Sequence, residues 1–153
     1  MNHNFSVNLA ETDDDFLDVI LLKHEDDSTA GFVSSEDATF EHVLSLREYG
    51  YNFWIARQGN KAIGYAVGNA ENSDIYRSEG IYVAPDFRRQ GVGFNLKKAQ
   101  INFARENEFT ELLADLTETN VAGKHIHEKL GFEIKPNGLG YTATLYVQMD
   151  HIK

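Results

Sequence analysis

The residues best suited to chemistry are a pair of arginines followed by closely spaced glycines, Arg88-Arg89-Gln90-Gly91-Val92-Gly93. They follow a short apolar run that is typical of a strand, and they precede a segment with helical spacing. The start of a helix exposes unpaired N–H groups and the positive end of its dipole, and glycines let the backbone curl around one anion. The turn therefore predicts a phosphate or pyrophosphate site, with a purely structural turn as the alternative.

Other kinds of chemistry lack the residues that they need. The chain has no cysteine, which excludes disulfides, thiolate catalysis and cysteine-ligated zinc, and which is typical of a reducing compartment. The glycine turn lacks the Gly-Lys-Ser/Thr of a Walker motif and the three glycines of a dinucleotide fingerprint. No serine elbow or HExxH sequence is present, so a hydrolase or a kinase has no support.

The elements that must position this turn follow from hydrophobic periodicity. The first half predicts a strand over 5–9, a helix capped by Thr12, a helix capped by Ser34 or Ser35 and stopped at Gly50, two strands flanking a turn at 58–61, and a loop over 69–78. The second half predicts a strand over 79–83, a helix over 92–106, a strand over 111–116, a helix over 121–130 and a hairpin around 136–138. This order predicts an α/β (α+β) fold in which helices cover a sheet with both parallel and antiparallel pairs.

Length and composition predict one soluble domain over residues 1–153. No apolar run approaches the ~18 residues of a membrane helix, and the first residues do not resemble a secretion signal. A cytoplasmic protein without membrane association is the expectation.

The net charge of -10 lies entirely in the first third of the chain. Residues 1–50 hold twelve acids and two bases, whereas residues 51–153 hold twelve of each. This distribution argues against a nucleic-acid partner and permits a cationic one. Solubility alone is the alternative explanation.

Two segments together resemble a known family. Arg88-x-x-Gly91-x-Gly93 after a strand is similar to the acyl-CoA-binding motif of the GNAT superfamily of N-acetyltransferases. Asn120, followed by His127-Glu128-Lys129-Leu130-Gly131-Phe132, resembles a second segment of that family, and Ile63-Gly64-Tyr65-Ala66 and the element order agree with it. The resemblance implies a single GNAT-like domain with about six to seven strands, about four helices and splayed central strands.

The resemblance also implies a role for acetyl-CoA as co-substrate, with no metal. Backbone groups of the turn would hold the pyrophosphate, main-chain groups of the preceding strand would pair with the pantetheine arm, and an asparagine would hydrogen-bond that arm. The implied binding residues are Ile81, Val83, Arg88, Arg89, Gln90, Gly91, Val92, Gly93, Phe94 and Asn120. The acceptor amine would attack the thioester directly, so that positioning supplies most of the rate.

Two proton transfers accompany such a reaction, because the amine must attack unprotonated and the departing thiolate gains from a proton. The family often uses a tyrosine as the acid, and this chain has His127 at that position. The alternative is that His127 is a packing residue. Glu79 is the first candidate for the base and Asp115 the second, although a strand aspartate can simply face solvent.

The class of the acceptor amine is inferred from the acidic residues of the first third of the chain. In this family the first two helices and the loop between them form one wall of the acceptor site, and the acidic third of the chain maps there. The acids that could form a negative entrance are Glu25, Asp26, Asp27, Glu36, Asp37 and Glu41. We therefore expect a polyamine or an aminoglycoside. A protein N-terminus and a non-catalytic acyl-CoA sensor are the alternatives, and the last hairpin could pair across a homodimer.

Overall fold

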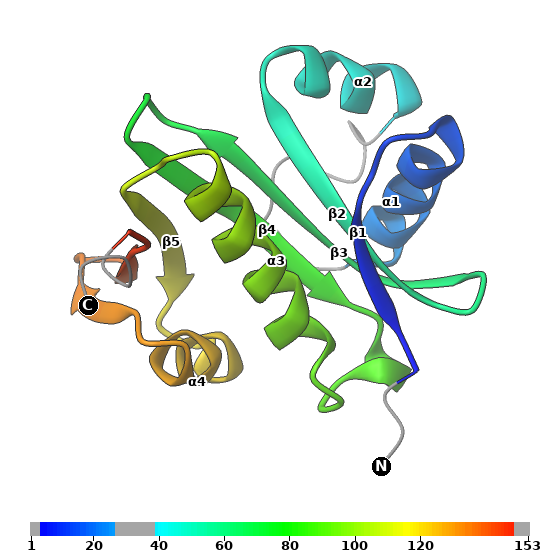
Figure 1. Ribbon diagram of the computed structural model, residues 1–153. Helices are drawn as coiled ribbons and strands as arrows, with labels where there is room; N and C mark the ends of the chain where they lie inside the picture. The colour runs from blue at the N-terminus through cyan, green and yellow to red at the C-terminus, as the bar shows by residue number, and fades with distance from the viewer. Residues whose placement is uncertain (1–3, 27–38, 149–153) are drawn as a thin grey trace. The chain divides into compact units, whose positions relative to one another are not determined.

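The computed structural model describes residues 4–26 and 39–148. Its elements are β1 (Ser6–Leu9), α1 (Asp13–Glu25), α2 (Phe40–Glu48), β2 (Tyr51–Gln58), β3 (Lys61–Ala70), β4 (Ile75–Val83), the 3-10 helix η2 (Pro85–Phe87), α3 (Val92–Glu106), β5 (Glu111–Thr117), α4 (Val121–Lys129), β6 (Glu133–Pro136) and β7 (Gly140–Tyr146) (Figure 1). Seven strands form one mixed sheet in the order β1-β2-β3-β4-β5-β7-β6, in which β4 and β5 are parallel. The predicted fold class and element order are confirmed.

The chain forms two compact units. The first unit comprises Met1–Asn69 and Glu79–Ala99, and the second comprises Ala70–Ser78 and Gln100–Lys153. β4 and α3 therefore each contribute residues to both units.

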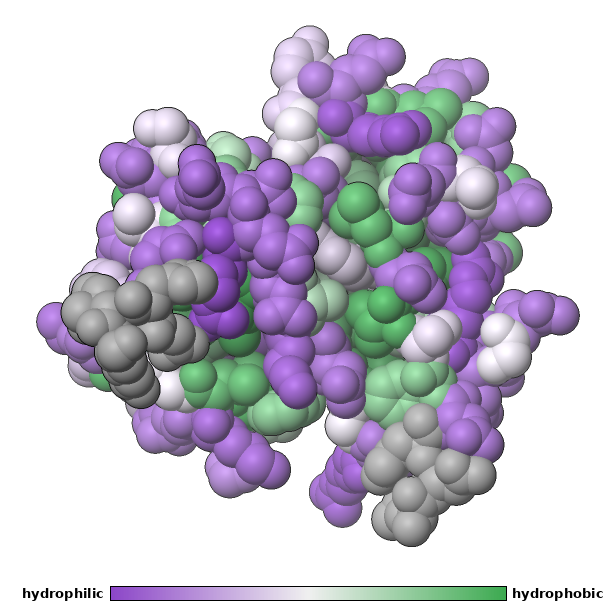
Figure 2. Space-filling model, viewed as in Figure 1, coloured by the Kyte–Doolittle hydropathy of each residue, from purple (hydrophilic) through white to green (hydrophobic). Residues whose placement is uncertain are grey.

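An apolar core joins α1 and α2 to the strands of the first unit. β1 pairs antiparallel with β2, and β2 pairs antiparallel with β3. The buried core residues are Ala10, Phe16, Val19, Ile20, Leu22, Val43, Phe53, Ile55, Tyr65, Val67 and Tyr82. The ring of Phe16 meets that of Phe53 edge to face, with centroids 5.9 Å apart. Outside this core, hydrophilic side chains cover most of the visible surface around α1 and α2, with smaller hydrophobic patches between them (Figure 2).

The start of α1 is fixed by a capping box, as predicted. The Thr12 hydroxyl accepts from the N–H of Asp15 at 3.1 Å, and the Asp15 carboxylate accepts from the N–H of Thr12 at 3.1 Å and of Glu11 at 2.9 Å. Arg57 on β2 donates to Asp15 at 2.7 Å and to Asp18 at 2.6 Å. Partial burial acts to raise the pKa of Asp15, but these hydrogen bonds together hold it below its ordinary value.

The predicted cap of α2 is wrong. Thr39 is the N-cap, with an extended backbone and a hydroxyl that accepts from the N–H of His42 at 3.2 Å. Ser34 and Ser35, the predicted caps, lie outside the described residues. Several serines and threonines precede this helix, and each has the chemistry of a cap. The apolar pattern of the sequence was therefore not sufficient to identify Thr39 as the N-cap of α2.

The predicted loop over residues 69–78 is also wrong for most of its length. β3 continues to Ala70, and β4 begins at Ile75 and pairs with β5 from Ile75↔Glu111 to Ser78↔Ala114. The turn between them is short because the Asn72 side chain accepts from the N–H groups of Asp74 and Ile75, both at 2.8 Å.

Burial explains why this strand escaped prediction. The Tyr76 ring packs against Phe103 and Phe109, with centroids 5.3 and 5.2 Å away. Only Tyr76 and Ser78 are buried between Ile75 and Ser78 of β4, and Ser78 is polar. The polar composition of this stretch therefore predicted a loop, although tertiary packing stabilises it as a strand.

The charge of Asp15 should stabilise the protein in a pH-dependent way. We expect Asp15→Asn to lower the free energy of unfolding by about 1 kcal/mol at pH 7. The folded-state pKa is depressed, so this contribution is present above the unfolded pKa of about 3.9 and is lost as the pH falls through the folded value.

Urea unfolding at pH 7 and near pH 2.5 measures the effect. Asp14→Asn, in the same helical turn, is the control and should cost less at pH 7 because Asp14 is exposed. Equal losses for the two variants at both pH values would contradict the assignment.

Candidate acyl-CoA site

The backbone between β4 and α3 makes a tight curl. β4 ends at Val83, and η2 leads to two residues with positive φ, Arg89 at 64° and Gly91 at 87°. Glycine adopts this region without strain, whereas a non-glycine residue such as Arg89 is uncommon there. α3 then begins at Val92. The predicted succession of strand, glycine turn and helix is confirmed.

The start of α3 is electrostatically unlike the starts of the two preceding helices. α1 has three aspartates in its first turn and α2 has Glu41, but the first turn of α3 has no acidic residue. The first four N–H groups of a helix have no carbonyl partner within it, and they carry its positive dipole end. Arg88 and Arg89 are exposed beside them. These groups fit an anion such as the pyrophosphate of an acyl-CoA.

Lys97 adds less positive charge than its residue type suggests. It lies on α3 and is only 1% exposed. Burial lowers its pKa to about 7, so that the neutral and charged forms coexist near neutral pH. At neutral pH, Arg88 and Arg89 therefore each contribute more positive charge than Lys97 does.

Arg88 is held against the end of β4. Its Nε donates to the carbonyl oxygen of Val83 at 2.9 Å, and its guanidinium carbon lies 5.7 Å from the centre of the Tyr82 ring. At the other end of the turn, the Asn95 side chain donates to the carbonyl of Gly91 at 2.7 Å. Sequence reasoning missed both Tyr82 and Asn95 as supports of the turn. The spacing of four residues between Gly91 and Asn95 was an available signal, whereas Tyr82 offered none beyond its strand pattern.

Gly64 allows β3 to approach this region closely. A Cβ atom there would lie 2.8 Å from the Tyr82 carbonyl oxygen and 3.4 Å from the side chains of Val92 and Leu96. The N–H of Ala84 also donates to the carbonyl of Ile63 at 2.8 Å. The absence of a side chain at Gly64 therefore sets the spacing of β3, the end of β4 and the first turn of α3.

The last part of β4 carries three of the predicted site residues. Glu79, Ile81 and Val83 alternate with Tyr82, so they share one face of the strand, and all three are half-buried. The structure thus brings Glu79 and the predicted pantetheine-binding strand together in the first unit with the turn. Asp115, Asn120 and His127 belong to the second unit.

Asn120 is the N-cap of α4. Its side-chain oxygen accepts from the N–H of Gly123 at 2.9 Å. A Cβ atom at Gly123 would lie 2.5 Å from the Asn120 amide nitrogen, so the glycine makes room for this side chain. With the oxygen used in the cap, the amide N–H₂ is the group that can serve as a donor to a ligand carbonyl.

His127 lies on the same helix and is 5% exposed. Its Nδ1 is 2.6 Å from the carbonyl oxygen of Gly123, and its ring meets that of Phe132 edge-on, with centroids 4.7 Å apart. A carbonyl can only accept, so we assign the proton to Nδ1. Nε2 then carries a proton only in the imidazolium form, which is the form that an acid requires.

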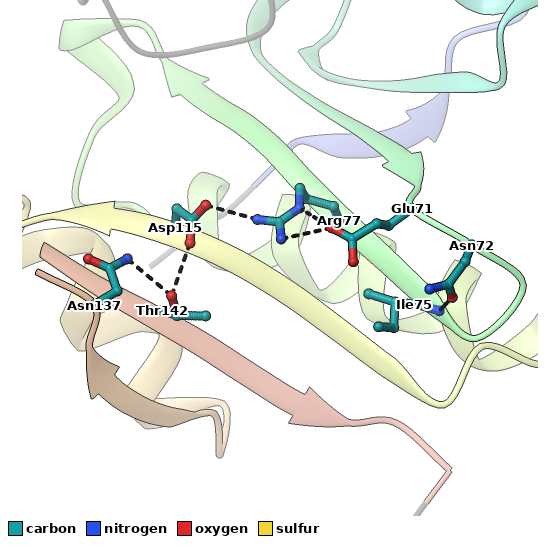
Figure 3. A network of polar contacts seen from close by, with 7 residues as sticks. All are labelled: Glu71, Asn72, Ile75, Arg77, Asp115, Asn137 and Thr142. Carbon is teal, nitrogen blue, oxygen red and sulfur yellow. Dashed lines mark hydrogen bonds and ion pairs between the residues drawn. The ribbon is translucent and has the colours of Figure 1, made fainter. Parts of the chain in front are cut away.

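Asp115 belongs to a polar network on the sheet of the second unit (Figure 3). Its carboxylate accepts from Arg77 at 2.8 Å and from the Thr142 hydroxyl at 3.1 Å. Arg77 also pairs with Glu71 at 2.9 Å, and Asn137 donates to Thr142 at 3.1 Å. These contacts give Asp115 a structural role in joining β4, β5 and β7.

The acids of the first third differ in their surroundings. Asp26 was expected at a solvent-facing entrance, but it is buried and lies 3.7 Å from Lys23. Glu25 and Glu41 are exposed. Asp27, Glu36 and Asp37 lie outside the described residues.

The described residues contain neither a cluster of metal ligands nor a helix of membrane-spanning character. Over residues 4–26 and 39–148, no three His, Asp or Glu side chains group closely enough to hold a metal ion. None of the helices in these ranges is long and apolar enough to cross a membrane.

Residues 14–132 match the Acetyltransferase (GNAT) family. This match spans both units and most of the chain, so the protein belongs to that family.

Curated relatives include two kinds of bacterial enzyme. Aminoglycoside N(6')-acetyltransferase type 1 of Salmonella typhimurium is 31% identical over 88 residues, which are 52% of this chain and 61% of that protein. L-amino acid N-acyltransferase MnaT of Escherichia coli is 29% identical over 89 residues, covering 56% of this chain and 52% of that one. The chain thus spans between half and two thirds of the length of these two relatives.

Solved structures share the fold over nearly the whole chain. YncA of Salmonella typhimurium, solved with its cofactor acetyl-CoA, has a TM-score of 0.78 and 17% identity and covers 96% of both chains. An N-acetyltransferase from Staphylococcus aureus Mu50 has a TM-score of 0.79 and 15% identity, with 94% of this chain and 99% of that chain covered. At these identities the likeness concerns the fold alone.

Gly64→Ala tests the close approach of β3. We expect a loss of about 1–3 kcal/mol in the free energy of unfolding, because the added methyl meets a backbone carbonyl that has little freedom to move. Urea denaturation measures this loss. A Gly64→Ala protein as stable as the parent would contradict the contact with Tyr82.

Proposed function

We propose that this protein is an N-acetyltransferase that moves an acetyl group from acetyl-CoA directly to a primary amine. The observation that carries the proposal is the start of α3, where positive φ at Arg89 and Gly91 precedes a first helical turn without acids. Family membership and the fold likeness to an acetyl-CoA complex support it. Acetyl-CoA supplies the activated thioester, and the chain supplies binding, orientation and proton transfer.

In this proposal the turn and the last part of β4 hold the co-substrate. Backbone N–H groups from Arg89 to Phe94, including those of Gln90, Val92 and Gly93, bind the pyrophosphate, and Arg88 adds positive charge. Main-chain groups of Ile81 and Val83 bind the pantetheine arm as a strand would. The amide N–H₂ of Asn120 donates to the same arm.

For proton transfer we propose Glu79 as the base and His127 as the acid. Glu79 shares a strand face with Ile81 and Val83, the proposed pantetheine-binding residues. Asp115 is the second candidate for the base, but its carboxylate is already bound by Arg77 and Thr142. His127 acts as the acid through Nε2, because its Nδ1 is bound to Gly123.

For the acceptor we propose a small cationic amine, such as a polyamine or an aminoglycoside. The exposed Glu25 and Glu41 provide negative charge on α1 and α2. The similarity to aminoglycoside N(6')-acetyltransferases supports the same class of acceptor. A charged entrance raises the encounter rate of a cation, and salt screens this attraction.

The release of free CoA from acetyl-CoA tests the proposed function. Separate pools of polyamines, aminoglycosides, amino acids and peptides serve as acceptors. We expect release with the polyamine or aminoglycoside pool, with an apparent affinity that falls steeply as salt is added. Release with peptides alone would favour a protein N-terminus as acceptor. Binding of acetyl-CoA without release in any pool would favour a sensor.

Gly91→Val should weaken the binding of acetyl-CoA by about tenfold or more, because a β-branched residue disfavours positive φ and disturbs the curl. Isothermal titration calorimetry measures the dissociation constant. Gly138→Val is a matched control, since Gly138 has φ +90° in open space in the β6–β7 turn. An equal loss of affinity in both variants would show a general effect of strain and would contradict the assigned site.

His127→Ala should lower kcat by about 10²-fold or more and leave the dissociation constant of acetyl-CoA nearly unchanged, because it removes a proton donor. The comparison requires kcat across pH 5.5–9 for the parent, His127→Ala and His125→Ala. His125 is exposed on the same helix and serves as the control. Unchanged turnover of His127→Ala across this range would assign His127 to packing.

A further inference from the structure

A cluster of charged and polar side chains lies inside the first unit, at the end of α1. Lys23 is 1% exposed and Asp26 is 8% exposed, and the Lys23 Nζ lies 3.7 Å from Asp26 Oδ2. Asp26 is also the C-cap of α1, where its N–H donates to the carbonyls of Leu22 and Lys23. The backbone and the side chain of Asp26 are therefore both fixed.

Tyr65 of β3 joins this cluster. Its hydroxyl donates to Asp26 Oδ2 at 3.4 Å, and the residue is 2% exposed. Burial and the nearby Asp26 carboxylate raise the pKa of Tyr65 far above its ordinary value, so the hydroxyl remains a donor at any working pH. We name Lys23, Asp26 and Tyr65 the buried triad.

Stability alone is a weak reason for such a triad. Desolvation of two charges offsets much of their attraction, and apolar residues of similar volume often stabilise a protein as well as a buried ion pair does. The Tyr65–Asp26 contact, at 3.4 Å, is longer than a typical charge-assisted hydrogen bond, but a buried hydroxyl that left its carboxylate partner would lose its hydrogen bond, which favours one position of Tyr65. The triad is therefore suited to holding Tyr65 in one place.

Tyr65 in turn contacts the supports of the glycine turn. Its ring centroid lies 5.9 Å from that of Tyr82, with the planes at 37°. The Arg88 guanidinium carbon lies 5.7 Å from the centre of the Tyr82 ring, and Arg88 Nε donates to Val83 O at 2.9 Å. The contacts thus run from the end of α1 through two tyrosines to the turn.

We infer that the buried triad is a positioning device for the acyl-CoA site, which acts through Tyr82 to hold Arg88 at the turn. Lys23, Asp26 and Tyr65 are positioning residues and do not touch the co-substrate. The inference rests on the proposed function, because it assigns the triad to the same acetyl-CoA site.

A double-mutant cycle tests this path. The dissociation constant of acetyl-CoA is measured by calorimetry for the parent, Tyr65→Phe, Arg88→Gln and the double variant. We expect Tyr65→Phe to weaken binding by about threefold to tenfold. The double variant should bind no more weakly than Arg88→Gln alone, because Tyr65 acts through Arg88. A merely structural triad would leave the dissociation constant unchanged or give effects that add.

Two further variants make the test specific. Tyr76→Phe removes a hydroxyl from another buried tyrosine, whose ring packs on Phe103 and Phe109, and it should leave the dissociation constant unchanged. Asp26→Asn keeps the shape of the side chain but removes its charge and one of its two acceptor oxygens, so it should weaken binding in the same direction as Tyr65→Phe. Thermal melts followed by circular dichroism establish that each variant is folded at the titration temperature.

The outcomes separate the inference from the proposed function. A parent protein that does not bind acetyl-CoA overturns both. A parent that binds, with Tyr65→Phe and Asp26→Asn unchanged in affinity or additive with Arg88→Gln, overturns the inference alone. If Tyr65→Phe does not fold, the cycle of Asp26→Asn with Arg88→Gln decides by the same criterion.

Discussion

The curl of the backbone into α3 is the constraint on which the rest of the candidate site depends. A helix start attracts an anion when its first N–H groups converge and no carboxylate of the chain competes for them. Positive φ at Arg89 and Gly91 curls the backbone directly before α3, and the first turn of α3 has no acidic residue to compensate the helix dipole. Gly64 completes the arrangement, because its missing side chain lets β3 support the Tyr82 carbonyl beside the turn.

In the second unit, one glycine orients two candidate residues at once. The N–H of Gly123 binds the Asn120 side chain, and its carbonyl binds Nδ1 of His127. A Cβ atom at this position would meet the Asn120 amide, so a larger residue would displace the Asn120 side chain from the cap. These contacts leave the Asn120 N–H₂ and His127 Nε2 as the groups that define the chemistry of each side chain. Structural and functional roles are therefore compatible in both residues.

The parts that the sequence predicted well are those set by local chemistry. The capping box at Thr12 and the curl at Gly91 depend on neighbouring residues only, so residue types were sufficient. The start of β4 depends instead on packing around Tyr76. Because its residues are mostly polar, the sequence predicted a loop there. The burial of Asp26 depends on Lys23 and on Tyr65 of a distant strand. The local sequence pattern around Asp26 does not predict these contacts. Within the site, the support from Tyr82 was missed for the same reason.

Tertiary contacts also change how much negative charge the acidic first third of the chain presents to its surroundings. Asp15 and Asp18 share Arg57, and Asp26 lies beside Lys23, so two cations of the chain offset most of the charge of these three aspartates at short range. A carboxylate paired in this way contributes little to the potential several ångströms away, where a substrate approaches. In the proposed function, the long-range attraction of a cationic acceptor comes from exposed acids such as Glu25 and Glu41. The net charge of this region is therefore larger than the negative potential that it produces at a distance. The proposal of a cationic acceptor rests on a few exposed carboxylates on α1 and α2.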